Sequence, residues 1–324
     1  MRLKGIFKKI TSHFNNVVLV ISTLVFIFFI FKLGLYFVDH ISARTANTLA
    51  SAIYYKIDKG ENVSGETIPV DLIGRQGNMV ISIDANEDGI IKSNSNQSNA
   101  SIPVNNKANI ISAPIADPTD KTDDPGGSSD NEPEPRKINQ SFLELLKINE
   151  DITGWIKIPD TKVDYPIVQG TDNDFYLKRN HEKKESRYGS IFMDFRNNFE
   201  SLDKNTILYG HHMADGMMFN NVAKYKQRKF FESHPYIFFS TLYDELKWEV
   251  FSVYVTDVNF DYIRVSFDAD NDFLEFVDVL KEKSIYETDI TLDSNDIILT
   301  LSTCSYEFEN ARTVVHAKLL EILE

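Results

Sequence analysis

The 324-residue chain contains a single cysteine, Cys304. One cysteine excludes an internal disulfide, so no oxidised framework stabilises the fold. Basic residues are also scarce, because 34 Lys and Arg stand against 48 Asp and Glu, a formal net charge of -14. Nucleic-acid binding is therefore set aside, since a phosphate backbone is bound by a basic face. The chain does have 42% hydrophobic and 12% aromatic residues, which is enough to build a sizeable core.

The longest apolar run lies near the N-terminus. Residues 1–16 contain four basic side chains and no acid, and residues 17–38 contain no charge except Lys32. A helix over 17–38 would be roughly 33 Å long, enough to cross a bilayer, with Lys32 close enough to one end to snorkel. The basic flank predicts a cytoplasmic tail over 1–16, a single-pass transmembrane signal anchor over 17–38 and an extracellular remainder. A cleaved signal peptide is the alternative, because small residues follow at Ala43, Ala46 and Ala50.

Residues 39–113 show no consistent periodicity, and we predict an extracellular region of unknown role. Within it, residues 84–89 match the opening of an EF-hand calcium loop, but position twelve is Ser95 instead of Glu. A polar turn is therefore preferred over a calcium site. Residues 117–135 then contain seven acids, one base and four prolines without an apolar side chain, which predicts a flexible acidic, Pro-rich linker over 114–137.

Residues 138–324 have the pattern of one globular domain. Helical spacing predicts a short helix around 142–149 and a longer helix over 270–283. Runs rich in β-branched and aromatic residues predict strands over 154–158, 163–168, 190–193, 206–209, 236–239, 247–256, 297–301 and 313–319. Many strands and few helices indicate a mainly β fold with accessory helices, either a barrel or a sandwich.

Cys304 comes at the end of one of these strands, where an apolar run turns polar. A lone cysteine is usually a small buried hydrophobic residue, but a strand end is also a rigid place to present a nucleophile. Arg312 begins the next strand, so a hairpin would place it beside Cys304. A guanidinium there can lower the pKa of the thiol and stabilise an oxyanion. The alternative for Arg312 is a surface ion pair with Glu307 or Glu309.

A cysteine nucleophile also needs an acid/base, and histidine titrates in the right range. His211 is the first candidate among seven histidines, because it directly follows the strand over 206–209 and Gly210. His212 ranks below it and is predicted at most to line a groove, whereas His316 alternates within the last strand and is predicted to be structural. Spacing alone leaves the pairing of Cys304 with His211 open.

Several separated motifs resemble the sortase family. Residues 300–304 (TLSTC) match the family's TLxTC signature, and Arg312 stands where the essential sortase arginine follows it. Residues 205–211 (NTILYGH) resemble the segment that carries the sortase histidine. Four further segments resemble class B sortases in particular: 149–156 (NEDITGWI), 164–169 (DYPIVQ), 189–192 (GSIF) and 194–197 (DFRN). The resemblance extends from about Phe142 to the C-terminus and makes 138–324 a sortase catalytic domain.

The resemblance implies an eight-stranded β-barrel and a two-step transpeptidation. Cys304 would attack the carbonyl of a threonine in a C-terminal sorting motif of a surface protein, while His211 protonates the leaving amine and Arg312 stabilises the oxyanion. A peptidoglycan amine would then resolve the thioacyl intermediate. Tyr209 and Ser302 become candidate substrate-binding residues, with strand packing as the alternative for both. No metal or organic cofactor is expected.

Two other functions stay open from the residues alone. The first is a cell-surface cysteine peptidase, which would release its acyl-enzyme to water. The second is a non-catalytic surface scaffold in which Cys304 is only a buried side chain. Both would retain the same membrane anchor.

Overall fold

The computed structural model describes residues 2–58 and 136–323. The calcium-like segment and the acidic linker lie outside the described residues. The helix α1 spans Arg2–Asp58, and its most apolar window lies within Asn16–Lys56, with a mean hydropathy of 2.6 and no buried residue. This helix is long and apolar enough to be a membrane anchor, as the sequence predicts.

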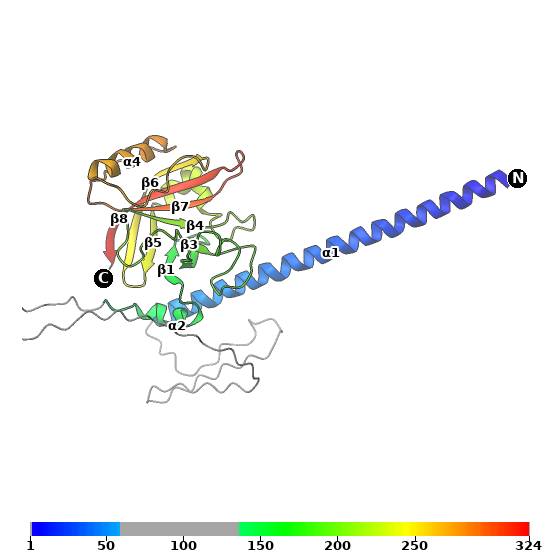
Figure 1. Ribbon diagram of the computed structural model, residues 1–324, viewed down its shortest axis with the longest axis horizontal. Coiled ribbons are helices and arrows are strands. Elements are labelled where there is room, and N and C mark those ends of the chain that lie inside the picture. Colours follow the sequence, from blue (N-terminus) through cyan, green and yellow to red (C-terminus); the bar gives the residue numbers. More distant parts are fainter. Residues whose placement is uncertain (1, 59–135, 324) are drawn as a thin grey trace, which may run out of the picture. The chain divides into compact units, whose positions relative to one another are not determined.

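The rest of the described chain is built around a closed barrel of eight strands, in the order β1-β2-β3-β4-β7-β8-β6-β5 (Figure 1). The pairs β2/β3 and β4/β7 are parallel, and the other six pairs are antiparallel. This confirms the eight-stranded barrel implied by the resemblance. The strands are β1 Ile152–Lys157, β2 Asp164–Val168, β3 Ile191–Met193, β4 Asn205–Tyr209, β5 Tyr236–Thr241, β6 Glu245–Thr256, β7 Ile298–Cys304 and β8 Arg312–Leu323.

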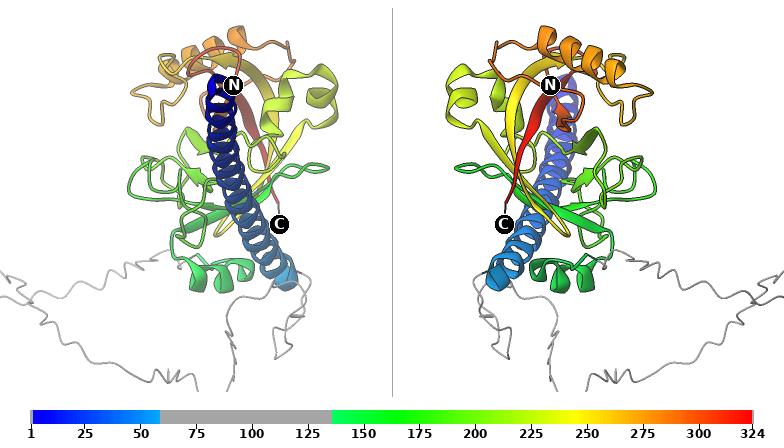
Figure 2. Two further views of the ribbon diagram at one scale, coloured as in Figure 1. Left: turned by 90° about the vertical axis from the view of Figure 1, so that its right-hand side faces the viewer. Right: turned by 90° about the vertical axis from the view of Figure 1, so that its left-hand side faces the viewer.

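Four helical segments accompany the barrel: α2 Gln140–Ile148, η2 Val222–Lys226, α3 Arg228–Ser233 and α4 Asp270–Lys283. The spacing of the apolar residues in α4 explains its packing, since Phe273, Phe276, Val277 and Leu280 share one face and are all buried. Figure 2 shows α2 and α4 at opposite ends of the barrel. The sequence predicted α2 and α4 but not η2 and α3, because five or six residues are too few to show a helical period.

The second half of α1 packs against the barrel domain. Ala43, Ala46, Ala50 and Tyr54 are buried at helical spacing, and the Tyr54 ring stacks on Trp155 with centroids 4.4 Å apart. The alanines that resembled a signal-peptide cleavage site thus form a buried helix face. The structure also differs from the predicted single region 39–113, because its first twenty residues continue α1 through Asp58.

The three strands that bear the candidate site are neighbours in the barrel, with β7 paired to β4 on one side and to β8 on the other. Every residue of β7 before Cys304 is buried, and β4 is buried up to Tyr209. Because β4 and β7 are parallel, with Tyr209 opposite Ser302, their carboxyl ends lie at the same barrel edge. The chain segments that follow these two strands therefore emerge side by side.

Candidate active site

A cavity of about 290 Å³ opens where β4 and β7 end and β8 begins. We call it the Cys304 cavity. All five residues predicted as site residues line it: Cys304, His211, Arg312, Tyr209 and Ser302. Residues that were not predicted complete the wall, among them Asn173, Leu177, Val258, Tyr262 and Ile263.

The predicted hairpin places Arg312 beside Cys304. The two residues are directly paired in the antiparallel β7/β8 ladder, and both side chains are partly exposed. The alternative ion pair with Glu307 is not formed, since Glu307 bonds to Lys226 and Ser305 instead. Partial burial acts to raise the pKa of Glu307. The bonds from Lys226 and Ser305 outweigh this effect and lower the pKa to about 2. No carboxylate of the described residues forms an ion pair with Arg312, whose guanidinium donates to the carbonyl of Ala311 at 3.0 Å.

His211 reaches the same cavity from the end of β4. The N–H of Gly210 donates to the carbonyl of Ser302 at 3.3 Å, so the chain beyond β4 still follows β7. The Nε2 atom of His211 lies 2.7 Å from the carbonyl oxygen of Leu177. Because a carbonyl can only accept, this bond assigns the hydrogen to Nε2. The Nδ1 atom is then the ring nitrogen left for proton exchange with a substrate.

Gly189 allows the Leu177 segment to lie this close to His211. Its φ of +58° is the left-handed conformation that favours glycine. A Cβ at position 189 would lie 2.7 Å from the Leu177 carbonyl oxygen and 3.1 Å from Cδ2 of His211. Glycine is thus required at this point of the GSIF motif by both backbone conformation and space.

The other two histidines considered have different surroundings. The Nδ1 atom of His212 lies 3.0 Å from the backbone carbonyl oxygen of Cys304, so this ring supports the end of β7 from outside the Cys304 cavity. His316 is fully buried and bonds to Tyr254 and Thr300, in agreement with the structural role predicted for it.

Tyr209 and Ser302 line the Cys304 cavity, but their hydroxyl groups are engaged within the protein. The Tyr209 hydroxyl donates to Asp194 at 2.8 Å, and the hydroxyl groups of Ser302 and Tyr262 lie 2.9 Å apart. Burial raises the pKa of Tyr262, against the opposing effects of its bond to Ser302 and the charge of Arg312. These bonds leave the Tyr209 ring as a part that can face a ligand, whereas the Ser302 backbone is paired with β4 and β8.

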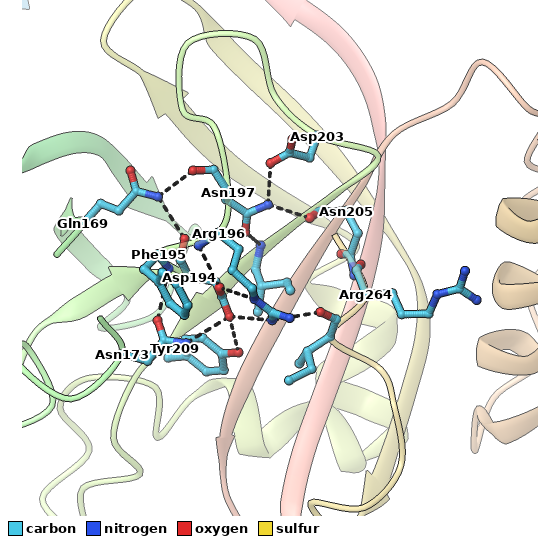
Figure 3. Close-up of polar contacts among 12 residues, drawn as sticks. Gln169, Asn173, Asp194, Phe195, Arg196, Asn197, Asp203, Asn205, Tyr209 and Arg264 are labelled. Atoms are coloured by element: carbon cyan, nitrogen blue, oxygen red, sulfur yellow. Dashed lines mark hydrogen bonds and ion pairs between the residues drawn. The ribbon is translucent and has the colours of Figure 1, made fainter. Parts of the chain in front are cut away.

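Figure 3 shows that Asp194 is the centre of the polar network behind Tyr209. Its fully buried carboxylate accepts two bonds from the Arg196 guanidinium, at 2.8 and 2.9 Å, one from the Arg196 backbone N–H at 3.0 Å, and one each from Tyr209 and Asn173. Burial opposes ionisation, but the bonds from Arg196 hold the pKa of Asp194 below its usual range. Arg196 also donates to the carbonyl of Ile263 at 3.0 Å. The Asp194–Arg196 ion pair thus contacts three residues of the Cys304 cavity wall: Asn173, Tyr209 and Ile263.

The five unpredicted wall residues named above come from two long loops, 169–190 and 257–269. The 169–190 loop has no periodic pattern, so sequence reasoning had no signal that places Asn173 or Leu177 near Cys304. In the 257–269 loop apolar residues alternate with polar ones at Val258, Phe260 and Tyr262, which indicates contact with an apolar surface but does not place Tyr262 or Ile263 near Cys304.

The barrel with a cysteine, a histidine and an arginine at one mouth defines a class of cysteine transpeptidase. A sortase domain model matches residues 156–320, and the chain belongs to the sortase family. Sortase B of Listeria monocytogenes is 40% identical over 186 residues, which cover 57% of this chain and 76% of that protein.

Solved structures show the same relationship. The Staphylococcus aureus sortase B–substrate complex has a TM-score of 0.54 and 42% identity, covering 57% of this chain and 86% of that one. A sortase B complexed with triglycine has a TM-score of 0.53 and 43% identity, covering 56% and 86%. The class B resemblance, the barrel and the transpeptidase function are thereby confirmed, and nothing in these comparisons favours a peptidase or a scaffold.

Proposed function

We propose that Cys304 is the nucleophile of this sortase, His211 its acid/base and Arg312 its oxyanion donor. The observation that carries the proposal is that all three side chains line one cavity. A thiol, an imidazole and a guanidinium supply the nucleophile, proton carrier and electrophilic stabiliser that acyl transfer requires.

In the first half-reaction the Cys304 thiol passes its proton to Nδ1 of His211, and the thiolate attacks the carbonyl carbon of a threonine in a sorting motif. A C–S bond forms and the oxyanion faces the Arg312 guanidinium. When the intermediate collapses, the C–N bond breaks and His211 gives its Nδ1 proton to the leaving amine. The product is a thioester on Cys304 and a free amine.

In the second half-reaction a peptidoglycan amine attacks the thioester and gives a proton to His211. A C–N bond forms, the C–S bond breaks, and His211 returns the proton to sulfur, which leaves a new amide and the Cys304 thiol. Water can replace the amine, so we also propose a slow hydrolase activity. The substrate and the triglycine bound to two related sortases support a peptide donor and an amine acceptor for this chain. Tyr209 and Ser302, which line the Cys304 cavity, are proposed to contact the donor peptide, Tyr209 through its ring.

The proposed location is the cell membrane, with one pass. Residues 1–16 form a cytoplasmic tail, 17–38 the anchor, and the barrel is outside the cell, with 114–137 as a spacer. The apolar, exposed surface of α1 supports the anchor, and the basic flank supports the orientation.

Mass spectrometry of the intact chain, incubated with a library of threonine-containing pentapeptides, tests the proposal. We expect a thioacyl adduct on Cys304 whose mass identifies the motif, and no adduct with Cys304→Ala. Adding an amine should convert the released product from acid to amide. An unmodified Cys304, or peptide cleavage that persists in Cys304→Ala, would contradict the assignment. If the acid remains the product when the amine is added, the chain is instead a peptidase.

A further inference from the structure

His212 directly follows the proposed acid/base, and its ring contacts the strand that carries the proposed nucleophile. The Nδ1 atom of His212 lies 3.0 Å from the backbone carbonyl oxygen of Cys304. Because a carbonyl can only accept, Nδ1 carries the hydrogen of this bond. The His212 side chain is not part of the wall of the Cys304 cavity, so any effect on the reaction must pass through the protein.

This bond continues the parallel pairing of β4 and β7 beyond the ends of their shared register. The register ends with Tyr209 opposite Ser302, and the N–H of Gly210 donates to the Ser302 carbonyl at 3.3 Å. Because a parallel ladder uses every second residue, the next acceptor is the carbonyl of Cys304, and its expected donor is the backbone N–H of His212. The imidazole of His212 donates to this carbonyl instead. One side chain thus joins the segment of the acid/base to the nucleophile itself.

Tyr306 makes a second bond to His212, from the loop that follows Cys304. Its hydroxyl donates to the backbone carbonyl of His212 at 3.0 Å, and the centroids of the two rings lie 4.9 Å apart. Tyr306 is 75% exposed, so these contacts with His212, and not burial in the core, hold its side chain in place. We call the two bonds, from the His212 ring to Cys304 and from Tyr306 to the His212 backbone, the His212–Tyr306 bridge.

The backbone on the His212 side of this bridge is fixed by the chain that follows it. The N–H of Phe219 donates to the carbonyl of His211 at 2.9 Å, and His212 pairs with Met218 in an isolated β-bridge. Phe219 and Met218 are both buried in the main hydrophobic core. Because these two residues are packed in the core, His212 gives Cys304 a rigid point of attachment.

We propose that His212 is a positioning residue for both half-reactions and that Tyr306 acts through it, an inference that rests on the proposed function. Proton exchange between the Cys304 thiol and Nδ1 of His211, and attack on a carbonyl carbon, both require a defined separation of the two side chains. The His212–Tyr306 bridge fixes the backbone of Cys304 relative to the chain neighbour of His211, and thereby this separation.

His212 itself transfers no proton in this role. The hydrogen on its Nδ1 atom is present both in the neutral tautomer that the bond to Cys304 selects and in the protonated ring. The bond is therefore kept whatever the charge of the ring. A side chain that donates from the same place without titrating should replace the imidazole.

The test compares His212→Leu with His212→Asn in the full chain in detergent, by single-turnover acylation at a series of donor-peptide concentrations. Leu cannot donate, whereas the amide nitrogen of Asn can take the place of Nδ1. We expect His212→Leu to lower the maximal acylation rate about tenfold or more, with the half-saturating peptide concentration within about twofold of wild type. His212→Asn should stay within about threefold and keep the same pH profile.

His234→Leu is the matched control. The Nδ1 atom of His234 also faces a backbone carbonyl, that of Phe230 at 2.9 Å, but this residue follows α3 and is not part of the Cys304 cavity wall. Its replacement should leave the maximal acylation rate unchanged. If His212 only stabilised the fold, both Leu variants would lower the unfolding temperature while the folded fraction acylated at the wild-type rate.

Tyr306→Phe tests the same bridge from an exposed position, where the fold is not at risk. We expect it to lower the acylation rate by about twofold to fivefold in the wild-type background, and to cause little further loss when it is added to His212→Leu. If His212→Leu does not fold, the loss in Tyr306→Phe alone supports the bridge and an unchanged rate overturns it.

Three other results would overturn the positioning role: an unchanged maximal rate in folded His212→Leu, an equal loss in His212→Asn, or additive losses in the double variant. Absence of a thioacyl adduct on Cys304 in the wild-type chain would instead overturn the proposed function, so the two failures are distinguishable.

Discussion

Arg312 stands opposite Cys304 with no acidic partner among the described residues, so its guanidinium is available to a ligand oxygen. We predict that Arg312→Lys lowers the acylation rate by about 10²-fold to 10³-fold, because an ammonium cannot reproduce the planar fork of donors. The measurement is a single-turnover acylation assay with thermal unfolding as a control. An acylation rate within threefold of wild type at unchanged stability would exclude an oxyanion role for Arg312.

Gly189 offers a second prediction for a single residue. Gly189→Ala should lower both kcat and the unfolding temperature, because the added Cβ meets the Leu177 carbonyl at 2.7 Å and its positive φ is strained. Gly216→Ala is the control, since Gly216 has a φ of +86° but its Cβ would meet only the flexible end of Lys162. The prediction fails if kcat falls equally in the two variants.

At the scale of elements, the strand ends could be read from the sequence and the loops could not. Apolar runs that end at Tyr209 and before Cys304 identified β4 and β7, and a polar stretch identified the hairpin to Arg312. These signals are local, because the alternation or run of apolar residues within a strand depends only on the sequence of that strand. The placement of Tyr262 and Leu177 depends instead on contacts across the barrel mouth, which no spacing encodes.

The Asp194–Arg196 pair connects these loops to the strands. We predict that Asp194→Asn raises KM for the donor peptide about tenfold with a smaller change in kcat. Asn173 and Tyr209 lose the carboxylate they donate to, and Arg196, which donates to the Ile263 carbonyl, loses its ion pair, while no bond of Cys304 is removed. A pre-steady-state assay separates the two parameters. Lys204→Gln is a control, since Lys204 bonds to carbonyl groups of the loop before β7 without contacting this pair.

A purely structural role for Asp194 would give a different result. Thermal unfolding would shift, since removing one member of a buried pair is costly, while KM and kcat of the folded fraction stayed unchanged. That outcome would show that the network stabilises the barrel without shaping the Cys304 cavity. Arg196→Lys should retain the charge but lose the two-point contact, and thus give an intermediate KM.

For the whole molecule, α1 joins the apolar N-terminal segment, the candidate membrane span, to the barrel. Tyr54 stacks on Trp155 and lies 5.4 Å from the Phe142 ring, both centroid distances. We predict that Tyr54→Ala lowers the free energy of unfolding by about 3 kcal/mol, through the lost ring and the cavity left behind. Ile41→Ala, at a position 58% exposed, should have little effect. Equal unfolding temperatures for the two variants in detergent would mean that α1 is not part of the cooperative unit.

The stability of the barrel should also depend on two neutral histidines. Burial lowers the pKa of His316 to about 3 and that of His181 to about 4. Thr300 donates its hydroxyl to Asn205, so it accepts from Nδ1 of His316, and Nε2 is left to accept from Tyr254. A proton on Nε2 would remove the acceptor that the Tyr254 hydroxyl uses, so the network fits only the neutral ring.

Both folded pKa values lie below the unfolded value of about 6.5, so the unfolded chain binds protons first as the pH falls. Stability is therefore complete above pH 6.5 and decreases toward the folded values, by about 2 kcal/mol per histidine at pH 5. We predict a falling unfolding temperature between pH 7.5 and 5, with a smaller fall in His316→Gln despite its lower starting stability. Equal slopes in the two proteins would show that His316 does not carry this dependence.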